Sequence, residues 1–457
     1  MSKSSGGIRV IDEKTPLFMI AGPMFLELLL NILLNNVDTL MLSRYSENSA
    51  GAVGNANQVM FLFIIMFNII ATAISVVVAQ YLGAKKYDEM DKIYTLALIV
   101  NLVFGIVLSS LLVLGKGLIT SFLNVSEGML PDVHTYLNIV GGGLFLQAGY
   151  NVMLQILRCN GYTKIGMIIS VIINLINIGG NYMFLFGPLK HLNLGVAGVG
   201  ISTVTARVIA LFCALLFFYR KKIGKISLKL LTPFPGKMLW KMIRIGLPSA
   251  GENFAYSMYQ LVLLSFVNPM GDDSVNARVF CNSLISFSMV FSNASAMATQ
   301  IITGHLVGAG KEEAAYKRVF STLKLTLPIT VLISVANWLL SPFTLRIFTK
   351  NEAIIQLGFM IMAVDVFLEI GRCLNMTVVS SLKAAGDYIY PLIVGLITMV
   401  LLGAVGGYCY GVVLGFGVAG IFAGTASDEC IRGLIVLDHW RRRKWFGKKV
   451  VDSDEDK

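Results

Sequence analysis

The chain has 457 residues, of which 56% are apolar and only 14% are charged. Soluble domains carry about 25% charged residues, so this composition excludes an ordinary soluble protein. The formal net charge of +11 lies mainly between apolar stretches, where an anionic membrane surface attracts it. No nucleic-acid partner is therefore expected.

Apolar stretches long enough to cross a bilayer as helices recur along the chain. Lipid leaves backbone polar groups unsatisfied in any open alternative, which predicts an all-α integral membrane protein. Twelve transmembrane helices are expected, near residues 17–42, 52–82, 93–115, 133–157, 163–187, 194–219, 242–267, 277–307, 318–340, 353–380, 388–411 and 416–438.

Basic residues gather in alternate connections between these helices. The link between the sixth and seventh helices is rich in Lys and Arg, and the tail carries four consecutive basic residues at 441–444. The positive-inside rule then predicts a multi-pass protein of the cell inner (plasma) membrane with both termini in the cytoplasm.

Cysteine and histidine indicate no metal or redox chemistry. The six Cys show no CxxC spacing and the four His are scattered, whereas metal sites need clustered ligands. No Walker A sequence is present, which argues against ATP-driven transport by this chain. No cofactor is expected.

The second half of the chain repeats the first. IAGPMFLELL (20–29), AQYLGAKK (79–86) and LRCNGYTK (157–164) resemble segments that begin 225 residues later, IGLPSAGENF, GHLVGAGK and LKAAGDYI. LGVAG (194–198) resembles FGVAG (416–420) at a spacing of 222. Two pseudo-symmetric six-helix lobes in parallel orientation are predicted. The expected divisions are an N-lobe at 1–219, a basic cytoplasmic linker at 220–241, a C-lobe at 242–440 and a basic then acidic tail at 441–457.

The first helix carries polar residues on one face. Glu27, Asn31, Asn35 and Asp38 lie within one stripe at 100° per residue. In the repeat, Glu27 matches Glu252, which indicates a scaffold role near the cytoplasmic gate. Asp38 matches the apolar Leu263, so it is interpreted as a coupling acid of one lobe.

The C-lobe holds further intramembrane acids. In the tenth helix Asp365, Glu369 and Arg372 share a face at spacings of four and three. Such residues are expensive in lipid and mark ion or substrate pathways. For Glu369 the alternative is a structural pair with Arg372. For Glu27 and Glu252, and for Asp38 near the opposite interface, it is hydration at the interface.

Carboxylates at these positions suit cation coupling. A buried acid can carry a proton, and two acids with amide or phenol oxygens can hold Na⁺; the sequence leaves both open. The predicted coupling residues are Asp38, Glu252, Asp365 and Glu369, of which the last three form the candidate Na⁺ site.

A substrate cavity is expected between the lobes. Its aromatic and Met residues offer a surface for organic cations, with ordinary helix packing as the alternative. The predicted cavity residues are Glu27, Asn31, Asn35, Asn177, Tyr256, Tyr259, Gln260, Asn282 and Arg372.

Several motifs together resemble the multidrug and toxic compound extrusion (MATE) family. They are VDTLMLSRYS (37–46), the QYLGAKK and HLVGAGK turns, GLPSAGEN (246–253) and FLEIGRCLN (367–375), and the resemblance spans residues 15–440. It implies two six-helix lobes and export of drugs and toxic cations in exchange for Na⁺ or H⁺. It also implies coupling roles for Asp38, in the VDT motif, and for Asp365, which resembles the helix-ten acid of the sodium-coupled branch.

Two departures from the family pattern shift attention to the C-lobe. Glu369 is a second acid beside Asp365, and the fifth helix lacks the Asp that the proton-coupled prokaryotic branch places there.

The predicted function is secondary active transport and not enzymatic catalysis. A monomeric multidrug efflux antiporter, in contact with membrane lipids, would export drug-like organic compounds, cationic or amphipathic, in exchange for Na⁺ or H⁺ by alternating access. The alternatives are a lipid-linked precursor flippase of the same superfamily, for which Arg207, Arg278 and Arg372 are too few and too scattered, and a channel-like membrane protein.

Overall fold

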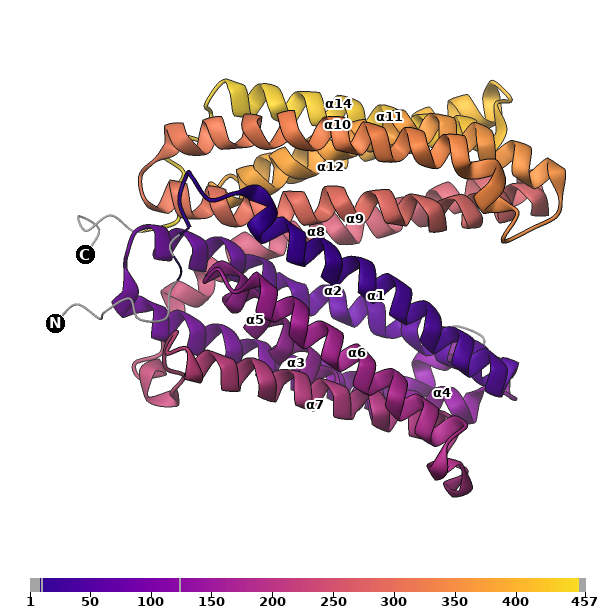
Figure 1. Ribbon diagram of the computed structural model, residues 1–457, viewed down its shortest axis with the longest axis horizontal. Helices are drawn as coiled ribbons and strands as arrows, with labels where there is room; N and C mark the ends of the chain where they lie inside the picture. The colour runs from indigo at the N-terminus through magenta and orange to yellow at the C-terminus, as the bar shows by residue number, and fades with distance from the viewer. Residues whose placement is uncertain (1–8, 10, 123–124, 452–457) are drawn as a thin grey trace. The chain divides into compact units, whose positions relative to one another are not determined.

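The computed structural model describes residues 9, 11–122 and 125–451. In this part of the chain the regular structure is helical and contains no strand (Figure 1). The long α-helices and helical segments are α1 (Leu17–Tyr45), α2 (Glu47–Gly83), α3 (Tyr87–Phe122), α4 (Leu130–Tyr136), α5 (Leu144–Cys159), α6 (Thr163–Leu185), α7 (Val196–Arg220), α8 (Gly236–Val267), α9 (Asp272–Gly308), α10 (Glu312–Leu345), α11 (Glu352–Ala384), α12 (Ile389–Thr398), α13 (Gly406–Tyr408) and α14 (Gly417–Arg441).

Each expected span coincides with a helix or with a run of helical segments. Most helices extend beyond the apolar stretch because polar residues begin them. Ser46 caps α2 by accepting a hydrogen bond from the Ser49 amide, and Asn351 caps α11 in the same way. Acidic residues fill the first turns of α9 and α10, where they complement the helix dipole.

Two spans are built from several segments. The fourth span is α4, the π-helix η1 (Leu137–Gly141) and α5, with a bend of 42°. The eleventh span joins α12, η5 (Met399–Val405), α13 and η6 (Cys409–Val413). The π-helical turns η5 and η6 interrupt the α-helical hydrogen bonding of that span.

The described chain divides into two compact units. The N-lobe contains Leu26–Gly246, and the C-lobe contains Ile11–Phe25 together with the chain from Leu247 onward. The division therefore falls inside α1 and inside α8. Within the N-lobe, α3 and α2 pack on α5 and α6 packs on α7; within the C-lobe, α11 packs against α9, α10 and α14.

Closely packed glycines join α14 to the eleventh span. Gly403, Gly407 and Gly411 recur every four residues and face Gly420 and Gly424 of α14. A Cβ atom at Gly420 would lie 2.6 Å from the carbonyl carbon and oxygen of Tyr410. Small residues at this spacing let helix backbones approach closely in lipid.

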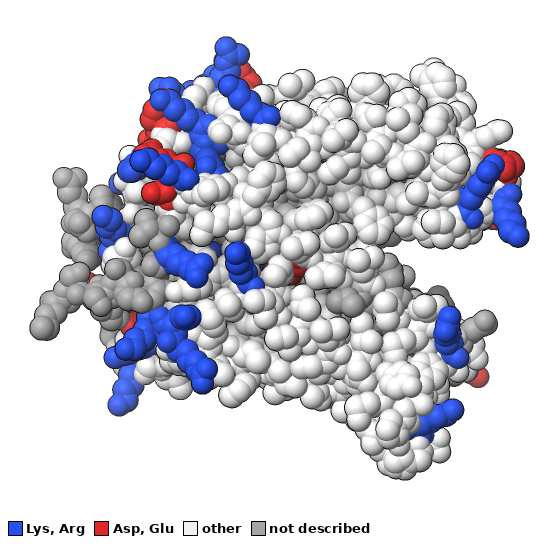
Figure 2. Space-filling view, viewed as in Figure 1, with Lys and Arg blue, Asp and Glu red and all other residues white. Residues whose placement is uncertain are grey.

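Large apolar side chains cover the outside of each lobe. Leu114 of α3 is 83% exposed and Leu332 of α10 is 70% exposed. On the face drawn in Figure 2, the charged residues of each lobe gather toward the ends of its helices and leave the middle largely uncharged. Such a band is suited to the hydrocarbon core of a bilayer.

Length and composition alone identify eight helices in the described residues that could cross a membrane, or nine with the bent α4–α5 pair. The long helices that fall outside this set are α1, α8 and α14. In α1 the described side chains form the shorter apolar stretch Leu17–Leu33. The helices α8 and α14 carry charged residues, among them Glu252 and Asp428, which lower their hydropathy.

Candidate functional site

A buried ion pair links two helices of the N-lobe. Nη2 of Arg158, at the end of α5, donates to Oε1 of Glu27 on α1 over 2.8 Å. The same oxygen accepts a hydrogen bond of 2.9 Å from the Ser170 hydroxyl of α6. An isolated buried charge is costly, so Arg158 explains how Glu27 is accommodated inside the lobe.

The C-lobe contains the counterpart of this ion pair. Oε2 of Glu252 on α8 lies 2.6 Å from Nζ of Lys383 on α11. Glu252 follows Glu27 by 225 residues, and Lys383 follows Arg158 by the same number. The side chains of the C-lobe pair are 13 and 14% exposed, against 2 and 6% in the N-lobe. Both partners of the pair are thus repeated.

The predicted group on the tenth span lies together on α11. Asp365, Glu369 and Arg372 are all buried, and Arg372 forms an ion pair with Glu369 one turn away. Asp365 is fully buried, and neither of its carboxylate oxygens has a hydrogen-bond partner. Its charged neighbours are Glu369 and Arg372. A cation can therefore bind to the Asp365 carboxyl group without breaking a hydrogen bond that the described structure contains.

The last helix adds a second group of charges, which the sequence predictions omit. Arg432 of α14 lies 2.8 Å from Glu429 and 3.4 Å from Asp428. The other Glu429 oxygen accepts a hydrogen bond of 2.8 Å from the Asn375 amide of α11. A related signal is present in the sequence: Asp428 and Glu429 precede Arg432 by four and three residues, which places both acids next to the arginine on one helix face.

The two groups form one network, named here the C-lobe charge cluster. Arg372 interacts electrostatically with Glu429 as well as with Glu369, and Tyr256 of α8 lies near both arginines. Its members are Asp365, Glu369, Arg372, Asp428, Glu429 and Arg432, all of them buried. Four carboxyl groups stand against two guanidinium groups, so the cluster has more acids than bases. Glu252 has its own basic partner in Lys383 and also interacts electrostatically with Arg432 of the cluster.

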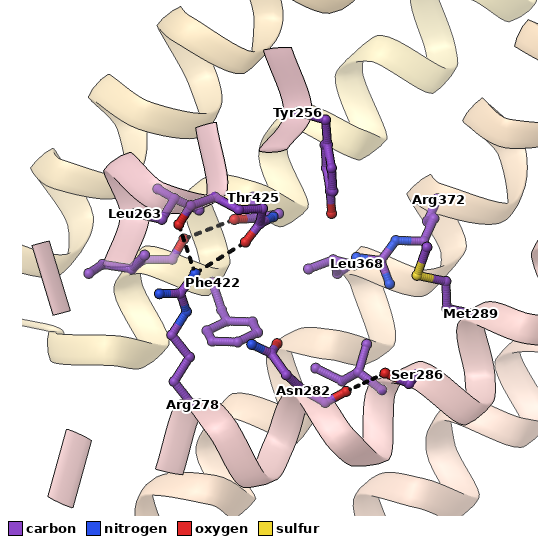
Figure 3. Close-up of a pocket in the computed structure, with 13 residues that line it drawn as sticks. Tyr256, Leu263, Arg278, Asn282, Ser286, Met289, Leu368, Arg372, Phe422 and Thr425 are labelled. Carbon is purple, nitrogen blue, oxygen red and sulfur yellow. Dashed lines mark hydrogen bonds between the residues drawn. The ribbon is translucent and has the colours of Figure 1, made fainter. Parts of the chain in front are cut away.

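A cavity of about 190 Å³ lies inside the C-lobe, next to the cluster. Arg372 belongs to both, because it also lines the cavity wall. In Figure 3, Arg278 and Arg372 stand on opposite sides, with Phe422 and Leu368 between them. The lining residues are Tyr256, Gln260 and Leu263 of α8, Arg278, Asn282, Ile285, Ser286 and Met289 of α9, Leu368 and Arg372 of α11, and Ile421, Phe422 and Thr425 of α14.

The N-lobe contains a larger cavity of about 510 Å³ in an equivalent place. Asn57, Met60, Phe61 and Ile64 of α2 line it, and the residues 225 places later, Asn282, Ile285, Ser286 and Met289, line the C-lobe cavity. Thr203 of α7 and Thr425 of α14 correspond at the spacing of 222. The duplication therefore repeats the cavity as well as the helices.

The predicted cavity residues are distributed among several positions. Tyr256, Gln260, Asn282 and Arg372 line the C-lobe cavity, and Asn177 lines the N-lobe cavity.

The remaining predicted cavity residues do not line either of these two cavities, or their side chains lie outside the described part of the structure. Asn31 accepts a hydrogen bond of 2.6 Å from Asn174, Tyr259 is hydrogen-bonded to Thr425 at 2.9 Å, and Glu27 is held by Arg158. The side chains of Asn35 and Asp38 lie outside the described part of the structure.

Metal binding was predicted at Glu252, Asp365 and Glu369. Among the residues that the structure describes, no group of three or more His, Cys, Asp or Glu side chains is arranged to hold a metal ion. Two of the three predicted ligands have a basic partner instead, Lys383 for Glu252 and Arg372 for Glu369.

Comparison with known proteins gives matches along nearly the whole chain. The MatE family matches twice, at residues 23–183 and again at 248–409. The chain belongs to this family. The second match begins 225 residues after the first, which is the spacing of the repeat, and the MATE resemblance of the sequence motifs is confirmed.

Relatives and solved structures support the same MATE assignment. The chain is 34% identical to the "Uncharacterized transporter YisQ" of Bacillus subtilis (strain 168) over 98% of this chain and 99% of that protein. It is 22% identical to the "Probable multidrug resistance protein NorM" of Thermotoga maritima, covering 97% and 96% respectively.

The fold matches solved MATE structures. One, described as the outward-facing conformation of a multidrug resistance MATE family transporter, has a TM-score of 0.88 at 20% identity, with 96% of this chain and 98% of that chain covered. Twelve transmembrane helices in two lobes are therefore confirmed, and the protein is a multi-pass membrane transporter. MATE proteins are secondary transporters and not enzymes.

Proposed function

We propose that this protein is an antiporter of the plasma membrane that exports small amphipathic organic compounds in exchange for an incoming cation by alternating access. Both termini would lie in the cytoplasm. The observation that carries this proposal is the C-lobe charge cluster, which has more acids than bases and lies beside a small cavity. Its family membership and its resemblance to NorM proteins named for multidrug resistance support the export role.

The C-lobe charge cluster has more acids than bases, so a bound cation would stabilise it. Ionised carboxylates without counterions are unfavourable in a low-dielectric interior. Asp365 and Asp428 are both fully buried, and neither acid has a hydrogen-bonded oxygen. Asp365 is the better candidate acceptor because Asp428 lies 3.4 Å from Arg432. A cation that enters from the outside and binds to Asp365 would stabilise the conformations in which this cation site is closed.

Arg372 supplies the link between cation and substrate. It is paired with Glu369 in the cluster and also lines the cavity. When a cation neutralises an acid of the cluster, the charge balance around Arg372 changes, and so does the field in the cavity. Ligand and cation drive transport only because they bind the inward-facing and outward-facing states differently.

The proton is favoured over Na⁺ as the coupling ion. Glu252 and Glu369 each have a basic partner, and a positive charge at that distance opposes binding of a metal cation. A proton needs only one carboxyl oxygen, and Asp365 offers two.

The test is transport by purified protein in liposomes, with pH and Na⁺ gradients imposed one at a time. Efflux of fluorescent norfloxacin is expected under the pH gradient and not under Na⁺ alone. Asp365→Asn should abolish gradient-driven efflux and leave equilibrium binding of norfloxacin in place. Asp88→Asn, at an exposed acid near the start of α3, is the matched control and should transport normally.

Each alternative outcome has a defined meaning. Efflux driven by Na⁺ alone would overturn the choice of proton and keep the antiporter. Equal efflux by Asp365→Asn and the unmodified protein would overturn the coupling site. Flux without saturation or counterflow would identify a channel-like protein.

A further inference from the structure

The C-lobe cavity contains an arginine whose charge has no acidic partner. Arg278 of α9 is 7% exposed and lines the cavity. Its Nη2 donates to the backbone oxygen and to Oε1 of Gln260, each at 3.1 Å. In the described part of the chain its ionisable neighbours are Tyr256 and Tyr259, and no ion pair involves it. Both of its hydrogen-bond acceptors are therefore neutral.

The charged residues that line the cavity are both basic. The described residues that line it include Arg278 and Arg372 and no Asp or Glu. Arg372 is neutralised from behind by Glu369, which leaves Arg278 as the uncompensated charge. Arginine stays protonated at any physiological pH, so this charge is permanent, and a buried charge is costly unless it is paired.

An anionic group on a ligand would supply the missing partner. Carboxylates, sulfonates and phosphates accept two parallel hydrogen bonds from a guanidinium group. Asn282 and Ser286 lie on the same face of α9, one and two turns further along, and add neutral polar contacts. Phe422, Leu368 and Met289 form an apolar wall for the body of the ligand.

The dimensions limit the ligand to a small one. A cavity of about 190 Å³ is below the usual range of roughly 300–1,000 Å³ for drug-sized ligands. It holds a single ring with a short acidic side chain, or the acidic end of a larger compound. Arg278 lies six residues after Asp272, the first residue of α9. The distance from that end of the helix to Arg278, along the helix axis, is therefore about 9 Å.

We propose that the C-lobe cavity binds the carboxylate of small amphipathic acids or zwitterions, with Arg278 as the residue that selects for the negative charge. This names the substrate class of the transporter proposed above and rests on that function for its physiological role. It replaces the expectation of cationic substrates for this cavity. A cationic ligand would meet Arg278 as a like charge with no acid in the lining to offset it.

The experiment measures equilibrium binding to the purified full-length protein in detergent. Three radiolabelled probes share one body and differ in charge: 3-phenylpropionate, 3-phenylpropionamide and 3-phenylpropylamine. The carboxylate is expected to bind at least about tenfold more tightly than the amide, as one charge-assisted bidentate pair provides, and the amine should bind most weakly. Arg278→Gln should abolish the preference for the carboxylate, and Arg278→Lys should retain part of it.

Two controls separate charge selection from damage to the fold. Arg346→Gln removes an arginine whose ion pair with Glu352 is exposed and should leave all three affinities unchanged. If Arg278→Gln loses the preference, it should still bind the amide as the unmodified protein does, which shows that the cavity is intact.

Equal affinities for the three probes, or a preference for the carboxylate that survives Arg278→Gln, would overturn the proposal. Failure of antiport is a separate result: carboxylate selection without gradient-driven efflux would keep this inference and reject the proposed function. Coupled efflux of ethidium at a rate unaffected by Arg278→Gln, with no carboxylate preference in binding, would keep the proposed function and reject this inference.

Discussion

Single buried charges decide much of the chemistry of this protein, and their partners determine their roles. Glu27 and Glu252 are each neutralised by one basic residue of the same lobe. Asp365 has no hydrogen-bond partner in the described structure, and the acceptors of Arg278 are neutral. Paired charges support the scaffold, whereas unsatisfied ones are the sites where a cation or a ligand can contribute most.

The first prediction concerns the N-lobe ion pair. Glu27→Gln leaves Arg158 as a buried, unpaired charge, and breaking such a pair typically costs about 3–5 kcal/mol. We therefore expect a large fall in the thermal unfolding midpoint of the purified protein. The double variant Glu27→Gln with Arg158→Met should recover most of it, because no charge is then left unpaired.

The matched comparison is Glu252→Gln in the C-lobe. Its pair is more exposed, and water compensates the remaining Lys383, so the loss should be smaller. A larger fall for Glu252→Gln than for Glu27→Gln would contradict the link between burial and cost.

The second prediction separates two adjacent acids. Glu429 pairs with Arg432 at 2.8 Å and accepts from Asn375, whereas Asp428 lies 3.4 Å from the same arginine. Glu429→Gln should therefore destabilise the protein more than Asp428→Asn. Differential scanning fluorimetry on both variants measures the order, and the reverse order would show that the longer contact is the dominant one.

At the scale of helices, close backbone approach fixes the position of α14. Gly420 and Gly424 face the glycines of the eleventh span, and on the other side Gly371 of α11 faces Cys430. The charges of α14 reach Asn375 and the α11 group because the helices are this close. Packing and charge placement therefore depend on the same small residues.

The third prediction tests that approach. Gly420→Ala places a Cβ atom 2.6 Å from the Tyr410 carbonyl carbon, so the backbones must separate, at a cost of about 1–3 kcal/mol as for other overpacked sites. A lower unfolding midpoint is expected. Gly251→Ala in α8 meets nothing within 4 Å and serves as the control, with a midpoint unchanged or slightly raised because Ala favours helix.

At the scale of the whole molecule, the basic connections predict how the protein is inserted. The segment between α7 and α8 is basic, and Lys190 lies in the short helix η2 (Pro188–Leu192) between α6 and α7. These two connections flank α7, which is long and apolar enough to span the membrane.

The fourth prediction follows from the positive-inside rule. In a variant without native cysteines, Lys225→Cys should react with a membrane-impermeant thiol reagent only after the cells are opened. Lys190→Cys should react in intact cells. Both lysines are exposed, so accessibility to the reagent reports the side of the membrane. Labelling of Lys225→Cys in intact cells would invert the proposed topology.

Much of the fold could be predicted from the sequence, because hydropathy and internal repetition are long-range signals. The spans, the spacing of 225 and the group on α11 all follow from them. Partners between helices could not be predicted in this way. Arg158 and Lys383 lie at positions that the repeat aligns, yet their contacts with Glu27 and Glu252 depend on how helices pack. The charges of α14 were not among the predicted residues, although their spacings of three and four are visible in the sequence.

The repeated ion pair also bears on how the two lobes are related. If the two residues of a salt bridge arise by separate substitutions, an intermediate protein carries one buried charge without a partner. Two independent origins of the ion pair would require such an intermediate twice. A single origin before the duplication requires it once. The cavity arginines are not repeated: Arg278 stands where the first copy has Val53, and Arg207 stands where the second has Glu429. One origin before the duplication is therefore the simpler account of the ion pairs, whereas each cavity arginine is present in only one copy of the repeat.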